Sequence, residues 1–124
     1  MTSKTALTGN VSPIAAGAHV VGAAFLGRTP ALALADGTIL LSGIGEETRA
    51  TAHADGAVLH AASDGRRFVT GGDDGLVVST GADGVTESLA DARGKWIDAL
   101  ALHADGAVAY AVARDVTVRD AKGG

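Results

Sequence analysis

The stretch that decides the fold is residues 53–78, which read HADGAVLHAASDGRRFVTGGDDGLVV. It holds three Asp-Gly pairs, at 55–56, 64–65 and 74–75, and the segments between them are short and rich in Ala, Val and Leu. An Asp-Gly pair tolerates the positive φ that a tight two-residue turn demands, so each pair predicts the tip of a hairpin. The stretch therefore predicts short antiparallel strands joined by tight turns.

The same rhythm continues along the rest of the chain. Six Asp-Gly pairs occur, and the steps between successive pairs are 19, 9, 10, 9 and 22 residues. Steps close to small multiples of about ten residues are typical of the strand-plus-turn unit of a meander. The sequence therefore predicts an all-β fold. The pairs begin at Asp36, Asp55, Asp64, Asp74, Asp83 and Asp105.

Three segments of the chain superpose with small gaps. They start at Val20, Ala57 and Asp98, which lie 37 and 41 residues apart. Four strands in a period of about 40 residues are typical of one blade of a β-propeller. We expect strands at 20–25, 29–34 and 38–41, at 57–62, 66–71 and 76–79, and at 98–103, 107–113 and 116–119, with further strands near 47–52 and 86–90.

These repeats predict antiparallel four-stranded blades of a β-propeller, about three of them, in one partial-ring domain over residues 1–124. The approximate blades are 19–52, 53–90 and 95–124, and residues 1–18 are a candidate closing strand for another blade. Propellers close with about four to eight blades, so three cannot complete a ring. We expect the remainder to come from a longer parent sequence, a second polypeptide or copies of the chain itself.

The second unit resembles a repeat of the WD-repeat β-propeller family. A His precedes its first strand, a Ser-Asp-Gly turn follows that strand, and its second strand ends in Thr-Gly before a further Asp-Gly turn. The resemblance implies that His53, Thr70 and Asp74 form a hydrogen-bonded set that ties the strands of the blade together. The Trp-Asp ending that names the family is absent, and Thr80-Gly81 stands in its place.

The other two units match the family pattern at fewer positions. In the first unit His19 and Asp36 match, and in the third unit only Asp115 does. The chain as a whole is similar to the amino-terminal three blades of a bacterial protein with a single WD-repeat propeller. That resemblance implies a non-enzymatic scaffold that presents its loops for protein recognition.

The composition argues that the chain depends on neighbours. Its 124 residues include one Trp, one Tyr and two Phe, while Ala and Gly dominate. A core of small side chains buries little area, and buried apolar area is worth only about 25 cal/mol per Å². We therefore expect the isolated chain to be marginally stable and its partners to be other protein chains or copies of itself.

Charge and residue content exclude several classes of partner and site. The net charge of −4 argues against nucleic acid, and the basic residues are too scattered to form a membrane-binding patch. No apolar stretch approaches the roughly 20 residues that a membrane-spanning helix needs. The chain has no Cys, which excludes disulfides and thiolate metal sites and fits a cytoplasmic location.

The sequence offers no motif for catalysis, a cofactor or a metal. It has no Gly-x-Ser-x-Gly nucleophile elbow. His53 and His60 are seven residues apart, and odd separations point to opposite faces of a strand, which argues against a shared metal ion. Asp73-Asp74-Gly75 lacks the spacing of a calcium loop and is better interpreted as a turn. We therefore expect a protein that is not an enzyme and binds no cofactor.

One residue is a candidate interaction anchor. Trp96 lies with Arg93 and Lys95 in the connection to the third unit, and aromatic and Arg residues are enriched at interface hot spots. The alternative is that Trp96 packs between neighbouring blades. Two functions thus compete: the interaction scaffold, and a propeller fragment, natural or engineered, that oligomerises into a closed ring.

Overall fold

The structure is a computed structural model that describes residues 13–43 and 46–121. Within these ranges the chain forms eleven β-strands. They are β1 (Val20–Leu26), β2 (Thr29–Leu34), β3 (Thr38–Gly43), β4 (Glu46–Thr51), β5 (Val58–Ser63), β6 (Arg67–Gly72), β7 (Leu76–Gly81), β8 (Thr86–Asp91), β9 (Ala99–Leu102), β10 (Val108–Val112) and β11 (Asp115–Arg119).

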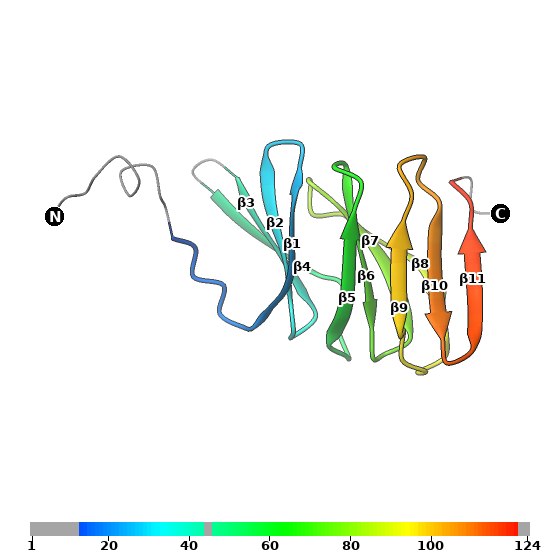
Figure 1. The fold of residues 1–124 in the computed structure, drawn as a ribbon. Coiled ribbons are helices and arrows are strands. Elements are labelled where there is room, and N and C mark those ends of the chain that lie inside the picture. The colour runs from blue at the N-terminus through cyan, green and yellow to red at the C-terminus, as the bar shows by residue number, and fades with distance from the viewer. Residues whose placement is uncertain (1–12, 44–45, 122–124) are drawn as a thin grey trace, which may run out of the picture.

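The strands form three separate antiparallel sheets that follow one another along the chain (Figure 1). The first sheet has the order β1-β2-β3-β4, the second β5-β6-β7-β8, and the third β9-β10-β11. Each sheet is therefore a meander of consecutive hairpins. The predicted all-β fold with antiparallel four-stranded sheets is confirmed for the first two units.

Aspartate side chains explain why the turns fall where they do. Five of the six Asp-Gly pairs place their Gly at a φ between 83° and 98°, a region in which other residues are strained. In each of the five, the Asp carboxylate accepts a hydrogen bond from the backbone N–H two residues further on, at 2.8 to 3.0 Å. The Asp thus closes the turn while the Gly supplies its conformation. The five Asp residues are Asp36, Asp64, Asp74, Asp83 and Asp105.

In the sixth pair, Asp55-Gly56, the glycine is required by close packing and not by its φ angle. Gly56 does not have a positive φ, but a Cβ added to it would lie 2.6 Å from the Oδ1 of Asp73 and 2.8 Å from the Cβ of Asp74. The tip of the second sheet's β6–β7 turn therefore rests directly on the backbone of Gly56. The Asp55-Gly56 pair lies in the connection between the first and second sheets, and this connection packs against the β6–β7 turn there.

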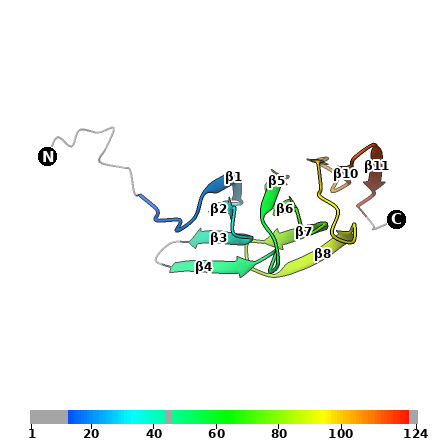
Figure 2. The same cartoon turned by 90° about the horizontal axis from the view of Figure 1, so that it is seen from below.

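The sheets stand face to face in a row. The first strand of each sheet lies beside the first strand of the next, so β1 packs against β5 and β5 against β9 (Figure 1). Seen from below, β1 and β5 lie along one side of the row and β4 and β8 along the other (Figure 2). This arrangement brings the flat faces of neighbouring sheets together.

Two apolar layers hold the row together. Between the first and second sheets, small residues such as Ala31 and Ala33 pack with Ile39, Phe68 and Val78. Between the second and third sheets, Val69, Val77, Ile97 and Val108 form the buried layer. Glycine allows the sheets to approach closely: a Cβ on Gly22 would lie 3.1 Å from the Cβ of Ala61.

The residue that packs between the second and third sheets is Ile97, not Trp96. Ile97 is fully buried, whereas Trp96 is 61% exposed. A Cβ on Gly71 would lie 2.6 Å from the Cγ2 of Ile97, so the isoleucine is seated against bare backbone. The alternative that placed Trp96 between the blades is therefore wrong.

The third sheet has one strand fewer than the other two in the part of the chain that the structure describes. Its outer strand, β11, pairs only with β10 there. Of the candidate closing strand 1–18, residues 1–12 lie outside the described residues, and residues 13–18 form no strand. The carbonyl of Ala15 accepts a hydrogen bond from Arg49 at 3.4 Å, which holds this segment beside β4.

We predict that Ile97→Ala lowers the free energy of unfolding by about 2–5 kcal/mol, because it leaves a cavity in the layer between two sheets. The adjacent exposed residue gives a matched control, since Trp96→Ala should change that free energy by no more than about 0.5 kcal/mol. Urea denaturation followed by far-UV circular dichroism, at one chain concentration, measures both. Equal losses in the two variants would contradict the assigned roles.

Candidate functional site

Three polar side chains form a buried hydrogen-bonded chain in the second sheet. The Nδ1 of His53 lies 3.0 and 3.1 Å from the two carboxylate oxygens of Asp74, and its Nε2 lies 2.8 Å from the Oγ1 of Thr70. When Nδ1–H donates to the carboxylate, Nε2 of the neutral ring accepts the proton of the Thr70 hydroxyl. His53 and Thr70 are fully buried.

Each member of this chain comes from a different local structure. His53 precedes β5, Thr70 lies on β6, and Asp74 lies in the turn between β6 and β7. The carboxylate of Asp74 also accepts the N–H of Leu76 at 3.0 Å, and the Oγ1 of Thr70 lies 3.5 Å from the carbonyl oxygen of Val78. The three side chains therefore connect the segment before β5 to the two middle strands of the sheet, β6 and β7.

A glycine makes room for this arrangement. A Cβ on Gly72 would lie 2.7 Å from the Nδ1 of His53 and 2.6 Å from the Oδ1 of Asp74. Any larger residue at this position would push the imidazole away from the carboxylate. The buried polar set and the Gly-Gly ending of β6 are thus one structural unit.

His53 also joins the second sheet to the first. Its backbone N–H and that of Ala52 both donate to the carbonyl of Gly37, each at 3.0 Å. Gly37 lies in the turn between β2 and β3 of the first sheet. The main chain of His53 is therefore held by the first sheet, while its side chain is held by the second.

The order Thr70–His53–Asp74 is the order of a nucleophile, a base and an orienting carboxylate in a hydrolase triad. Burial decides against such a role. Thr70 has no exposed surface, and no group of a substrate can approach its hydroxyl without opening the sheet. Every polar atom of the set is directed at another protein group, so the arrangement braces the fold.

The matching residues of the first unit are not brought together. His19 is exposed and directly precedes β1, whereas His53 lies five residues before β5. Asp36 accepts the N–H of Thr38 at 3.0 Å, as Asp74 does from Leu76, but no hydrogen bond joins it to His19 in the described chain. Because His19 directly precedes β1, it does not occupy the position, five residues before the first strand, from which His53 reaches Asp74.

Asp115 of the third unit also lies elsewhere than the pattern implies. It is the exposed first residue of β11 and pairs with Val112 across the hairpin. The turn before it consists of Ala113 and Arg114, with Ala113 at a φ of 53°. This turn is one residue shorter than the turn that holds Asp74, so Asp115 is already part of the strand.

The candidate interaction residues are on the surface. Arg93, Lys95 and Trp96 are all exposed, in the connection between β8 and β9. Arg93 has a φ of 57°, and its N–H is held by the carboxylate of Asp91 at 2.8 Å. The connection therefore has a defined turn that presents Trp96 outward while the next residue, Ile97, packs inward.

An Arg-centred contact between the second and third sheets was not anticipated from the sequence. The Nη2 of Arg67 donates to the carbonyl of Gly106, and its Nε lies 3.8 Å from the carboxylate of Asp64. Desolvation of Asp64 raises its pKa, but hydrogen bonds from the N–H groups of Arg66 and Arg67, together with their charges, outweigh it and leave the pKa lowered. The acceptor is a backbone carbonyl, which any residue type provides, so the sequence did not indicate this contact.

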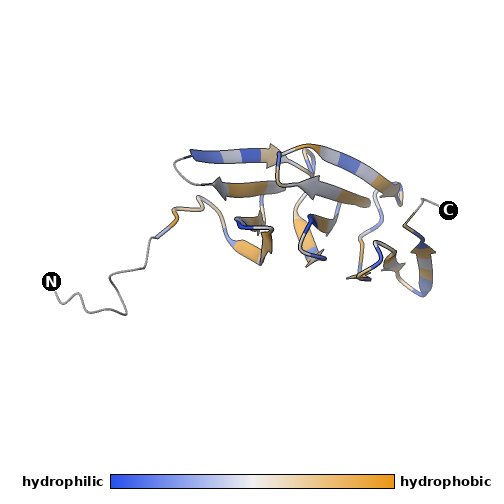
Figure 3. Ribbon diagram, turned by 90° about the horizontal axis from the view of Figure 1, so that it is seen from above, coloured by the Kyte–Doolittle hydropathy of each residue, from blue (hydrophilic) through white to orange (hydrophobic). Residues whose placement is uncertain are grey.

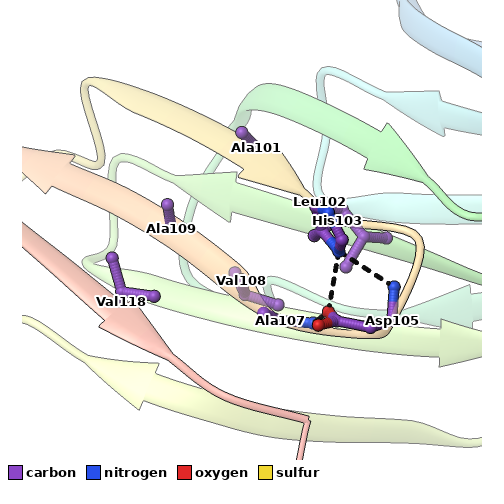
Figure 4. A pocket seen from close by; sticks show the side chains of 8 residues that line it. All are labelled: Ala101, Leu102, His103, Asp105, Ala107, Val108, Ala109 and Val118. Carbon is purple, nitrogen blue, oxygen red and sulfur yellow. Dashed lines mark hydrogen bonds and ion pairs between the residues drawn. The ribbon is translucent and has the colours of Figure 1, made fainter.

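A shallow hollow lies on the third sheet (Figure 4). His103 and Asp105 stand at one end of it, with the Nδ1 of His103 3.0 Å from the Oδ1 of Asp105, and both side chains are exposed. The remainder of its lining is apolar. These residues are Ala101, Leu102, Ala107, Val108, Ala109 and Val118.

Residues 13–43 and 46–121 contain no group of three or more His, Cys, Asp or Glu side chains placed to hold a metal ion. They also contain no helix with the length and apolar character that crossing a membrane requires.

Comparison with known proteins shows the fold. No protein-family model matches the chain, and no curated protein matches it. Among solved structures, the computationally designed Ika4 protein is similar, with a TM-score of 0.72 and 24% identity over 88% of this chain and 70% of that chain. The computationally designed Ika8 protein has a TM-score of 0.64 and 25% identity over 82% of this chain and 33% of that chain.

We predict that Thr70→Val lowers the free energy of unfolding by about 1–3 kcal/mol, because it leaves the buried Nε2 of His53 without its partner. Thr80 gives a matched control within the same sheet. It is also fully buried, and its Oγ1 has no hydrogen-bond partner in the described structure, so Thr80→Val should be neutral or stabilising. Urea titration of both variants tests this difference, and an equal effect would remove the special role of Thr70.

Proposed function

We propose that this chain is a non-enzymatic β-propeller fragment that assembles with copies of itself into a closed ring. The observation that carries the proposal is that both end sheets of the row have exposed apolar residues. Val116 and Val118 on the third sheet are 70% and 66% exposed, and Phe25 on the first sheet is 65% exposed. Apolar surface of this kind is typical of interaction sites.

The architecture gives this surface a physical reason. A propeller sheet buries its two faces only when it stands between two neighbours, as the second sheet does here. A row of three blades leaves two faces uncovered, and rings need about four to eight blades. Additional blades, supplied by further copies, would cover both faces.

The comparisons support the same proposal. Ika4 and Ika8 are computationally designed proteins, and the aligned part is 70% of the Ika4 chain and 33% of the Ika8 chain. The three-sheet arrangement thus occurs within longer chains. In this chain, additional sheets would have to come from outside the described residues or from other copies.

The unpaired edge of the third sheet fits the proposal as well. The two preceding sheets have four strands each, whereas β11 is the outer strand of a three-stranded sheet in the described residues. We propose residues 1–18 of the same or another copy as the closing strand of this edge.

The proposal assigns no catalytic role, cofactor or metal to the chain. The Thr70–His53–Asp74 set is buried and internally satisfied, which supports a bracing role. The hollow on the third sheet holds one exposed His-Asp pair among apolar residues, which supports packing against another apolar surface better than chemistry.

We predict that native mass spectrometry and light scattering at micromolar chain concentration find one closed species whose mass is an integer multiple of 12.2 kDa. A ring satisfies every end face, so the distribution should stop at one size instead of extending into filaments. A strictly monomeric, folded chain under these conditions would contradict the proposal.

A second candidate function, a scaffold for protein recognition, is favoured by the exposure of Trp96. This side chain is 61% exposed and follows two exposed basic residues, Arg93 and Lys95. Neither buried layer uses it. It is therefore free to act as an aromatic anchor for another protein.

We predict that Trp96→Ala abolishes binding of such a partner and leaves the circular dichroism spectrum and the oligomeric mass unchanged. Affinity capture with the wild-type and variant chains, followed by mass spectrometry of the captured proteins, measures the difference. Ala82, an exposed residue in the β7–β8 turn, gives the control variant Ala82→Glu, which should capture the same proteins as wild type. Identical capture by the Trp96→Ala chain would remove this function.

A further inference from the structure

One face of the third sheet consists entirely of apolar side chains and is open to solvent in the described structure. The cross-strand pairs place Ala101, Ala109 and Val118 in one row and Ala99, Ala111 and Val116 in the next. We call these six residues the third-sheet face. Figure 4 shows three of them, Ala101, Ala109 and Val118, along the shallow hollow.

The opposite side of the same sheet is already used. Leu100, Leu102, Val108, Tyr110 and Val112 alternate with the residues of the third-sheet face and pack against the second sheet. The third sheet is therefore buried on one side only. Figure 3 shows hydrophobic residues along β11, the strand nearest the carboxyl end of the row.

The corresponding face of the first sheet shows what covers such a surface. There, the third strand β3 presents Ile39 and Leu41, which are 0% and 2% exposed because Phe68 and Val78 of the second sheet pack on them. β11 is likewise the third strand of its sheet, and its two valines alternate on the matching side. The third-sheet face is thus equivalent to the face of the first sheet that the second sheet covers.

The first sheet carries the complementary surface at the other end of the row. On β1 and β2, its open side is formed by the cross-strand pairs Ala23 with Leu32 and Phe25 with Pro30, and its outer strand β4 adds Arg49 and Glu47 to the same side. We call the four residues of the two pairs the first-sheet face. In the second sheet, the place of Pro30 is taken by Phe68, which is 1% exposed and packs against the first sheet. The first-sheet face is therefore the side by which a sheet packs onto the preceding one.

We infer that the third-sheet face of one copy binds the first-sheet face of a second copy, as the second sheet binds the first within the chain. This inference rests on the proposed self-assembly and specifies its interface. The residues of both faces are apolar, so an apolar partner surface fits both. Arg49 and Glu47 lie on the same side of the first sheet, in its outer strand, and they pair with each other at 3.4 Å. The two faces differ, and the contact is therefore head to tail, the kind of interface that closes into rings.

Two charge-introducing variants test the direction of this contact. Val118→Glu disables the third-sheet face, and Phe25→Glu disables the first-sheet face; both side chains are largely exposed, so the fold of one chain should persist. Each variant alone has only one working face and should give the mass of a single chain in native mass spectrometry. Mixed in equal amounts, they should form a dimer of one copy of each and nothing larger.

Other results have definite meanings. If one variant alone forms a dimer, or if the mixture stays monomeric while the wild type assembles, the head-to-tail contact is wrong although self-assembly stands. If the wild type itself is monomeric, the proposed function fails first. Ala82→Glu introduces the same charge in an exposed turn away from both faces and should keep the wild-type mass.

Cross-linking gives a second test that does not depend on the charged variants folding. The chain has no Cys, so single cysteines can be placed freely. Ala23 in β1 occupies the position equivalent to Ala61 in β5. Ala61 packs against Gly22 of the preceding sheet, where an added Cβ would lie 3.1 Å from the Cβ of Ala61. In the third sheet the place of Gly22 is held by Ala99, which pairs with Ala111 as Gly22 pairs with Ala33. A short bis-maleimide should therefore link Ala23→Cys to Ala99→Cys in a mixture, while either variant alone gives no linked dimer. Linked dimers of one variant alone would overturn the inference.

Discussion

The rest of the structure depends on one constraint, which is that a small-residue β-sheet gains stability only when another sheet covers it. The faces of the described sheets offer many small residues, such as Ala31 and Ala33, and a larger side chain such as Phe68 is buried because a second sheet covers it. Stability must therefore come from the number and closeness of sheet-to-sheet contacts. Glycines such as Gly22 and Gly71 shorten the distance between neighbouring sheets and strengthen these contacts.

The two joints between neighbouring sheets meet this constraint with different chemistry. Between the first and second sheets, His53 bonds by its main chain to the turn at Gly37 and by its side chain to Thr70 and Asp74. Between the second and third sheets, the main chain of Ile97 bonds to the carbonyl of Gly72 at 3.2 Å, and its side chain packs against Gly71. Both joints also contain an apolar layer, and the second has a polar contact of its own, from Arg67 to the carbonyl of Gly106.

The strands could be predicted from the sequence because the turns obey a local rule. An Asp that accepts the N–H two residues ahead, followed by a Gly at positive φ, is specified by two adjacent residues such as Asp74 and Gly75. The meeting of His53, Thr70 and Asp74 was implied by a family pattern and has the geometry described above. The surroundings of His19 and Asp115 were not predictable from residue type. They depend on the length of the segment before β1 for His19 and on the length of the β10–β11 turn for Asp115. Similarly, nothing local distinguishes Ile97 from Trp96 as the residue that turns inward.

The apolar layers in both joints have a consequence for how the molecule responds to temperature. Apolar packing weakens on cooling, because the entropy of water that drives it declines. Both joints therefore lose strength in the cold, and within the first of them the hydrogen bonds of His53 are the part that does not share that dependence. Cooling thus weakens the contacts along the whole row of sheets and not at one end of it alone.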